Sequence, residues 1–128
     1  MPDGRREPTP FDHHHQLQGA LIDAYEAALL DGTDRRVAAE TLARLVEFTA
    51  VHFADEELLM TARAYPGLEA HHLAHQRAME QVIDLEKDAS VATRELSLAN
   101  IHRLRRWLVD HVAGLDRAFA DWLKANPA

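Results

Sequence analysis

Apolar side chains recur every three or four residues along most of the chain, which is the period of a helix that packs by one face. The clearest example, near the carboxyl end, joins Leu98, Ile101, Leu104, Leu108, Val112, Leu115, Phe119 and Trp122. No stretch alternates apolar and polar residues with a period of two, so strands are not predicted. We therefore expect an all-α protein.

Three earlier stretches have the same period, with faces that run through residues 11–29, 42–59 and 71–85. Thr9-Pro10 is a typical helix start, Gly32 a typical stop, and Pro66 cannot continue a helix. Four helices with short connections predict an up-down-up-down antiparallel four-helix bundle. We expect it to cover residues 11–124, after a short polar N-terminal arm at 1–10 and before a tail at 125–128.

Histidines and carboxylates interrupt these faces where core side chains are expected. The interrupting residues are His15, His52, Glu56, His71, His75 and His111. Residues four apart on a helix project to the same side, so His52 with Glu56, and His71 with His75, form two pairs of neighbouring ligand groups. Burying such groups without compensation costs several kcal/mol. Each alone is typical of a hydrogen-bonded or surface side chain, but their occurrence on all four inward faces predicts a metal site in the core.

The composition narrows the chemistry of that site. At 128 residues, with 47% hydrophobic residues and no cysteine, the chain is expected to form one domain whose metal ligands are nitrogen and oxygen. A net charge of -7 argues against nucleic acid as a partner. The segment 1–10 has no apolar run that could act as a signal or membrane span, so we expect a cytoplasmic protein without a membrane partner.

Other histidines fall off the inward faces and are expected to be solvent-exposed: His13, His14, His72 and His102. Glu69 and His72 form one Glu-x-x-His, an element that ferritin-like di-iron bundles use twice. The missing second copy argues against that class. Imidazole with carboxylate suits iron, and ligand type alone leaves zinc and manganese open.

Several strings in this sequence resemble the hemerythrins, and particularly the single-domain bacterial ones. They are Asp12-His13-His14-His15, then His52-Phe53-Ala54-Asp55-Glu56-Glu57-Leu58-Leu59-Met60, then Tyr65-Pro66 before His71 and His75, and finally Trp107-Leu108-Val109-Asp110-His111 followed by Asp116. Counting back from Ile22-Asp23, which is similar to a family Ile-Asn, selects His15 on the first helix. His14 then stands where the family commonly has glutamine.

The resemblance implies a di-iron site joined by a bridging oxo or hydroxo group. His71, His75 and His111 would ligate one iron, His15 and His52 the other, and Glu56 and Asp116 would bridge them. One coordination position would stay open on the second iron, where dioxygen would bind reversibly. The implied role is oxygen storage, delivery or sensing, without enzymatic activity. The alternative is a di-iron enzyme that reduces peroxide or nitric oxide.

An apolar pocket is expected around the open position, with Trp107 and Leu108 assigned by resemblance and Ile22 and Phe53 by helix phase. Gln18 and Gly19 replace family positions that are usually larger and apolar. We expect them to make the pocket more polar, with faster autoxidation.

The spacing of His111 and Asp116 departs from a regular helix. They are five residues apart, which separates them by about 140° around an α-helix. For both to face the site, either Asp116 reaches in from the flank or the helix has a local wide turn.

Overall fold

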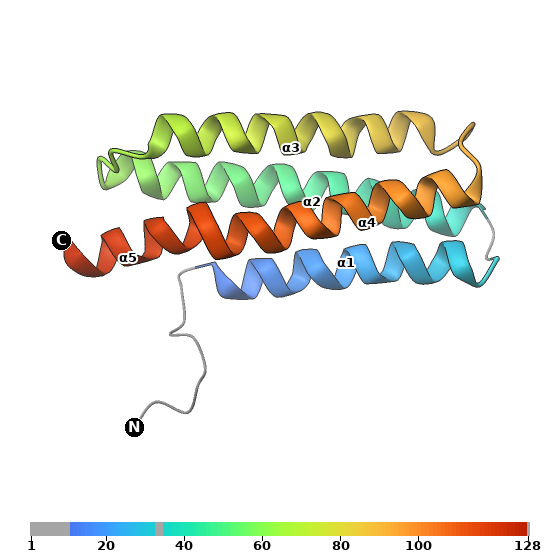
Figure 1. The fold of residues 1–128 in the computed structure, drawn as a ribbon, viewed down its shortest axis with the longest axis horizontal. Helices are drawn as coiled ribbons and strands as arrows, with labels where there is room; N and C mark the ends of the chain where they lie inside the picture. The colour runs from blue at the N-terminus through green and yellow to red at the C-terminus, as the bar shows by residue number, and fades with distance from the viewer. Residues whose placement is uncertain (1–10, 33–34, 128) are drawn as a thin grey trace, which may run out of the picture.

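The computed structural model describes residues 11–32 and 35–127, and these form four helical rods (Figure 1). The first three are α1 (Asp12–Leu30), α2 (Arg35–Ala62) and α3 (Leu68–Asp88). The fourth consists of α4 (Arg94–His111), a π-helical turn η1 (Val112–Asp116) and α5 (Arg117–Ala125). The predicted all-α bundle is confirmed. The predicted arm at 1–10, including Thr9-Pro10, lies outside the described residues.

Each rod packs against two others: α1 and α3 both contact α2 and α4 (Figure 1). Residues with a positive φ follow the ends of α1 and α2, where the chain turns into the next helix. Gly32 follows α1 with a φ of 65°, which favours glycine, and Ala64 follows α2 with a φ of 55°. The amide of Tyr65 then donates to the Met60 carbonyl at 2.9 Å, which closes the last turn of α2.

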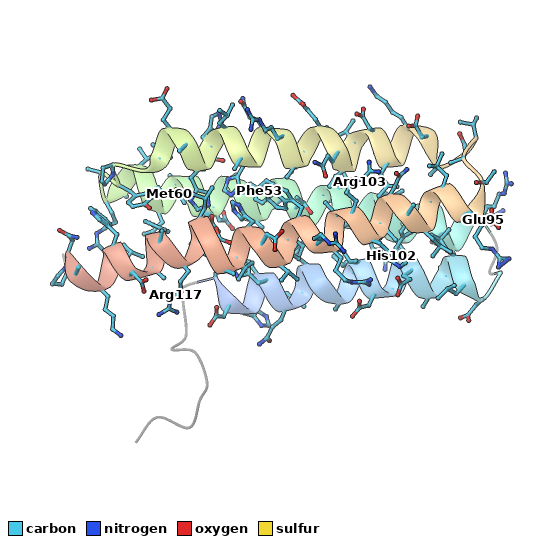
Figure 2. All side chains as sticks on the ribbon, in the orientation of Figure 1. Phe53, Met60, Glu95, His102, Arg103 and Arg117 are labelled. Carbon is cyan, nitrogen blue, oxygen red and sulfur yellow. The ribbon has the colours of Figure 1, made fainter. Side chains whose placement is uncertain are left out.

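The interior divides along the bundle into an apolar half and a polar half. The apolar half is one cluster that comprises Ile22, Tyr25, Leu42, Leu45, Val82, Leu85, Ile101, Leu104 and Leu108. The polar half contains the buried histidines and carboxylates, and Phe53 and Met60 lie beside them inside the bundle (Figure 2). His102 and Arg103, by contrast, lie on the outside of α4.

Beyond the polar half, an aromatic cluster closes that end of the bundle. The Tyr65 ring centroid lies 4.7 Å from that of Phe119 and 5.1 Å from that of Trp122. The polar side chains are thus enclosed between this aromatic cluster and the apolar core.

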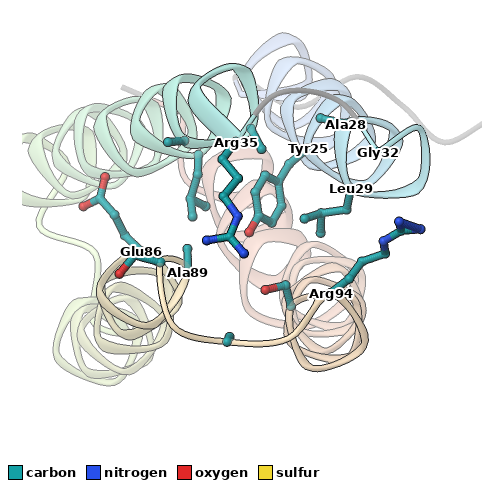
Figure 3. Close-up of a pocket in the computed structure, with 14 residues that line it drawn as sticks. Tyr25, Ala28, Leu29, Gly32, Arg35, Glu86, Ala89 and Arg94 are labelled. Carbon is teal, nitrogen blue, oxygen red and sulfur yellow. The ribbon is translucent and has the colours of Figure 1, made fainter.

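A cavity of about 530 Å³ opens at the opposite end, between the termini of the four rods (Figure 3). Tyr25 and Leu42 line its inner wall, and Ala38, Ala39 and Ala89 leave the space unfilled. The cavity is therefore separated from the buried histidines by the apolar core.

The apolar face predicted for the fourth rod is wrong at Leu115. Leu115 is 36% exposed, whereas the next residue, Asp116, is buried. The π-helical turn causes this difference, because its extra residue per turn shifts the inward position by one.

Candidate metal centre

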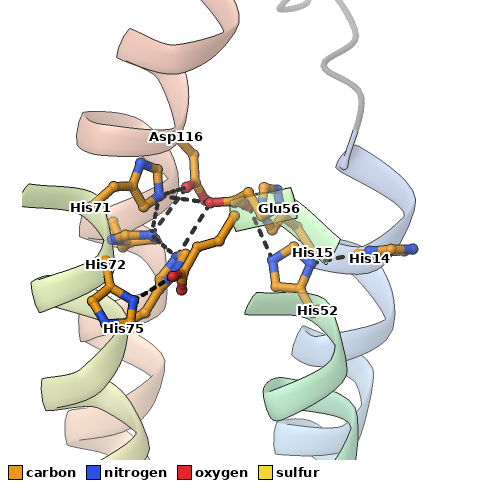
Figure 4. A network of polar contacts seen from close by, with 10 residues as sticks. His14, His15, His52, Glu56, His71, His72, His75 and Asp116 are labelled. Carbon is orange, nitrogen blue, oxygen red and sulfur yellow. Dashed lines mark hydrogen bonds and ion pairs between the residues drawn. The ribbon is translucent and has the colours of Figure 1, made fainter. Parts of the chain in front are cut away.

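The structure brings together all seven residues that were predicted as metal ligands. One group of atoms that could hold an ion comprises Glu56, His71, His75, His111 and Asp116, and a second comprises His15, His52 and Glu56. Within each group the candidate ligand atoms lie within 4.8 Å of one another. The two groups share Glu56, so they are neighbouring halves of one centre (Figure 4).

Three imidazole nitrogens converge in the larger group. The Nε2 atom of His111 lies 3.1 Å from that of His71 and 3.2 Å from that of His75. α3 contributes His71 and His75 one turn apart, and His111 is the last residue of α4. Three ring nitrogens aimed at one point are the arrangement that a bound cation requires.

Each carboxylate directs one oxygen toward each half of the centre. Glu56 Oε1 lies 2.6 Å from His71 Nε2 and 3.3 Å from His75 Nε2. Its other oxygen, Oε2, lies 3.4 Å from His52 Nε2 and 3.9 Å from His15 Nε2. Glu56 therefore spans the two groups of histidines.

Asp116 spans them in the same way. Its Oδ1 atom lies 2.8 Å from His71 Nε2 and 3.0 Å from His111 Nε2, and its Oδ2 atom lies 2.9 Å from His15 Nε2. The five-residue separation from His111 is accommodated by the π-helical turn at Val112–Asp116. Of the two geometries that the sequence allowed, the structure has the wide turn.

The donor atoms fit a bound metal better than they fit one another. Both oxygens of Glu56, Asp116 Oδ2 and His15 Nε2 are buried without a hydrogen-bond partner, although nitrogen and oxygen atoms lie within contact distance. Buried polar atoms are rarely left unpaired in native proteins. Lone pairs that face a common centre from several helices would all be satisfied by cations placed between them.

Burial and the neighbouring carboxylates shift the pKa values of the metal-free histidines in opposite directions. Burial by itself would lower the pKa of His15 and His71, but contacts with Asp116 and Glu56 outweigh it and raise both to about 9. Burial lowers the pKa of His52 to about 4. Two imidazoles thus hold protons at neutral pH where cations would supply the positive charge, and His52 is already neutral.

The pKa values of the two carboxylates are lowered. Burial would raise the pKa of Glu56, but close contacts with the His15, His71 and His75 rings outweigh it and lower the pKa to about 2. The pKa of Asp116 is lowered as well, since His111, His15 and His71 outweigh the effect of its burial. Both carboxylates therefore carry the negative charge that a cation site needs.

Two groups outside the predicted set contact the outer nitrogens of these histidines. Glu57 Oε2 lies 2.8 Å from His75 Nδ1, and its other oxygen contacts His72. His14 Nδ1 lies 3.1 Å from His52 Nδ1, so the prediction that His14 is a solvated side chain is wrong. The helical period of inward positions could not predict either contact, because Glu57 and His14 lie off the inward faces and contact the Nδ1 atoms of the rings.

The other off-face histidines behave as predicted. The side chains of His72 and His102 are 50% and 57% exposed, and each contacts a glutamate, Glu57 or Glu26. His13 is exposed on α1.

Aromatic rings cover the side of the centre that faces the apolar core. Phe53 stacks on His75 with ring centroids 3.9 Å apart, and Trp107 stacks on His111 at 4.5 Å. Leu108 and Ile22 are buried in the adjoining apolar cluster. Of the predicted pocket residues, Phe53 and Trp107 therefore contact candidate ligands, and Ile22 lies two helical turns beyond His15.

Comparison with known proteins identifies the family. Residues 9–123 match the family model described as the hemerythrin HHE cation binding domain. The chain belongs to the hemerythrin family. The predicted family is confirmed.

Named hemerythrins from bacteria and animals are similar to the chain. A bacteriohemerythrin of Stenotrophomonas maltophilia is 34% identical over 72% of this chain and 60% of its own length, so the match spans less than two thirds of that relative. A myohemerythrin of Sipunculus nudus is 32% identical over 86% of this chain and 89% of its own length. A bacteriohemerythrin of Methylococcus capsulatus is 26% identical over 89% and 86%.

Membership of the hemerythrin family supports oxygen binding at a non-haem iron centre at the level of the family. Hemerythrins are oxygen carriers and not enzymes, which agrees with the expectation that this chain is not an enzyme. Across residues 11–32 and 35–127, no helix is both long enough and apolar enough to cross a membrane.

Proposed function

We propose that this hemerythrin-family chain binds two iron ions in its core and binds dioxygen reversibly at one of them, for storage, delivery or sensing. The observation that carries the proposal is the placement of Glu56 and Asp116. Each directs one oxygen toward His71 and the other toward His15, at distances between 2.6 and 3.9 Å. Two carboxylates that face two groups of histidines are suited to bridge a pair of cations.

The proposed roles follow from this division. His71, His75 and His111 would hold one iron, and His15 and His52 the other. An oxo or hydroxo group would complete the bridge with the carboxylates. Iron bound in this way would supply the electrons that dioxygen takes up on binding and returns on release.

The position left open would lie on the side of His15 and His52, where fewer protein ligands are available. Phe53 stacks on His75 and Trp107 stacks on His111, so these rings would exclude water from the iron that has three histidine ligands. Leu108, from the apolar cluster, would cover the opening. Excluding water favours reversible binding, because water promotes the loss of reduced oxygen species.

The test is to load the protein with ferrous iron without air and then to admit and purge oxygen. We expect two irons per chain and a visible charge-transfer band that appears with oxygen, disappears on purging and returns. His15→Gln should hold a single iron and give no reversible band. His13→Gln, which changes an exposed histidine two residues away, should match the unaltered protein.

Two outcomes would contradict the proposal. One iron per chain in the unaltered protein would refute the di-iron centre. If two irons bind but the visible band is lost irreversibly while peroxide or nitric oxide is consumed, the protein is a reductase.

A further inference from the structure

Gln18 is a buried polar side chain in the layer next to the metal centre. It is 3% exposed and lies three residues after His15 on α1. Its Nε2 atom donates to Thr49 Oγ1 at 3.0 Å, and Thr49 lies three residues before His52 on α2. Because one helical turn advances about 5.4 Å, the Gln18–Thr49 pair lies one turn from the facing rings of His15 and His52.

The other end of this amide has no partner. Gln18 Oε1 is buried and accepts no hydrogen bond from any residue that the structure describes. The same layer is completed by Ala78, three residues after His75, and Leu108, three residues before His111. Neither side chain can donate a hydrogen bond. Among the described residues, the next layer on one side is apolar and the next layer on the other side is the metal centre, so a donor to Gln18 Oε1 has to come from the side of the metal centre.

The hydrogen bond to Thr49 leaves the oxygen end of the Gln18 amide free. Thr49 Oγ1 accepts from Gln18 Nε2, and Gln18 Oε1 accepts from no residue that the structure describes. The amide is therefore held with its nitrogen on Thr49 and its oxygen available.

We propose that Gln18 determines which small ligands the centre prefers. Its Oε1 atom accepts a hydrogen bond from the outer atom of a ligand bound beside His15 and His52. The centre then favours ligands that carry a proton on that atom, such as hydrogen peroxide or its monoanion, over ligands that cannot donate. The inference rests on the proposed function, because it requires iron held by these two histidines.

Two anions of similar size and shape test the proposal on the iron-loaded, oxidised protein. Azide has no hydrogen, whereas the monoanion that cyanamide forms on losing a proton still carries one hydrogen on its end nitrogen. Gln18→Met keeps the side-chain length and removes the acceptor. We expect it to weaken cyanamide binding about 3- to 10-fold, the usual effect of one hydrogen bond, and to change azide binding less than about 2-fold. The dissociation constants are read from the visible spectrum.

Further variants separate this role from a structural one. Gln16→Met changes an exposed glutamine on the same helix and should alter neither constant. Thr49→Val leaves Gln18 in place but removes its anchor, and it should reduce the preference for cyanamide. Iron-free Gln18→Met should unfold at the same temperature as the unaltered protein or a higher one, because it removes an unpaired buried acceptor.

The outcomes discriminate between the two proposals. If iron and both anions bind but Gln18→Met leaves the ratio of the two constants unchanged, the role of Gln18 is refuted. Weaker azide binding alone would also refute it, since the amide would then act as a donor. If the unaltered protein gives no iron-dependent anion band, the proposed di-iron function itself fails.

Discussion

At the scale of single residues, the candidate ligand histidines differ in the partner that contacts the Nδ1 atom of the ring. His75 and His52 have polar partners on Nδ1, namely Glu57 and His14. A carboxylate on the outer nitrogen fixes the ring orientation and makes the other nitrogen a stronger ligand. Glu57 can therefore act on a bound metal through His75 without touching it.

We expect Glu57→Ala to lower iron affinity about 10- to 100-fold, because such partners of ligating histidines have effects of this size. Glu57→Gln should lose less, since its amide oxygen can still accept from His75. Iron affinity is measured by competition with a chelator. Asp55→Ala, on the exposed side of α2, serves as the control. Equal affinities for Glu57→Ala and the control would show that the contact is incidental.

The ligand positions themselves could be predicted from the sequence, because His52, Glu56, His71 and His75 interrupt otherwise apolar faces. Glu57 and His14 could not be assigned a contact, since a residue adjacent to an inward position points to the helix flank. The only signal for Glu57 was its place in the string resembling the hemerythrins. What lies on a flank depends on the packing of neighbouring helices, which period alone does not give.

At the scale of elements, the π-helical turn at Val112–Asp116 positions one of the two bridging candidates. The sequence showed that a regular helix could not direct both His111 and Asp116 inward, but it left two solutions open. Spacing fixes an angle around an axis and not the path of the backbone. For the same reason, Leu115 was placed on the buried face and is exposed.

Inserting one alanine between Ala113 and Gly114 should disable the centre. Everything after the insertion turns by about 100°, which moves Asp116 and Phe119 off the inward face. We expect fewer than two irons per chain and a loss of about 3–5 kcal/mol in unfolding free energy, comparable to removing a buried phenylalanine. Metal analysis and chemical unfolding measure these effects.

An alanine inserted between Val91 and Ala92, in the exposed connection before α4, provides the matched control. It should fold and load iron normally, since surface connections tolerate added residues. Normal iron content in the first variant would mean that the turn can absorb another residue and that it does not fix Asp116.

At the scale of the whole molecule, the interior has two halves. One is an apolar cluster, and the other contains buried polar atoms that lack hydrogen-bond partners and would be satisfied by bound metal. The bundle was predictable because the period of the apolar residues agreed with the positions of the helix-breaking glycine and proline residues. The cavity at the far end was not, since Ala38, Ala39 and Ala89 give no signal that distinguishes an unfilled space from close helix packing.

Removing iron should therefore destabilise one end of the bundle more than the other. We expect the midpoint of thermal unfolding to fall by about 5–10 °C, because a ligand that binds only the folded state stabilises it. Amides near His52 and His71 should exchange hydrogen faster, while those near Leu45 and Ile101 stay protected. Calorimetry and hydrogen exchange measure the two effects. Uniformly faster exchange would show that the two halves unfold as one.

The π-helical turn also bears on how related sequences should be aligned. A wide turn is what one added residue leaves in an α-helix, so a histidine and an acid five apart across it occupy the same places as a pair four apart in a regular helix. His52 and Glu56 are such a pair. A search that demands a five-residue spacing in the last helix would miss any chain that holds the same two groups four apart in a regular helix.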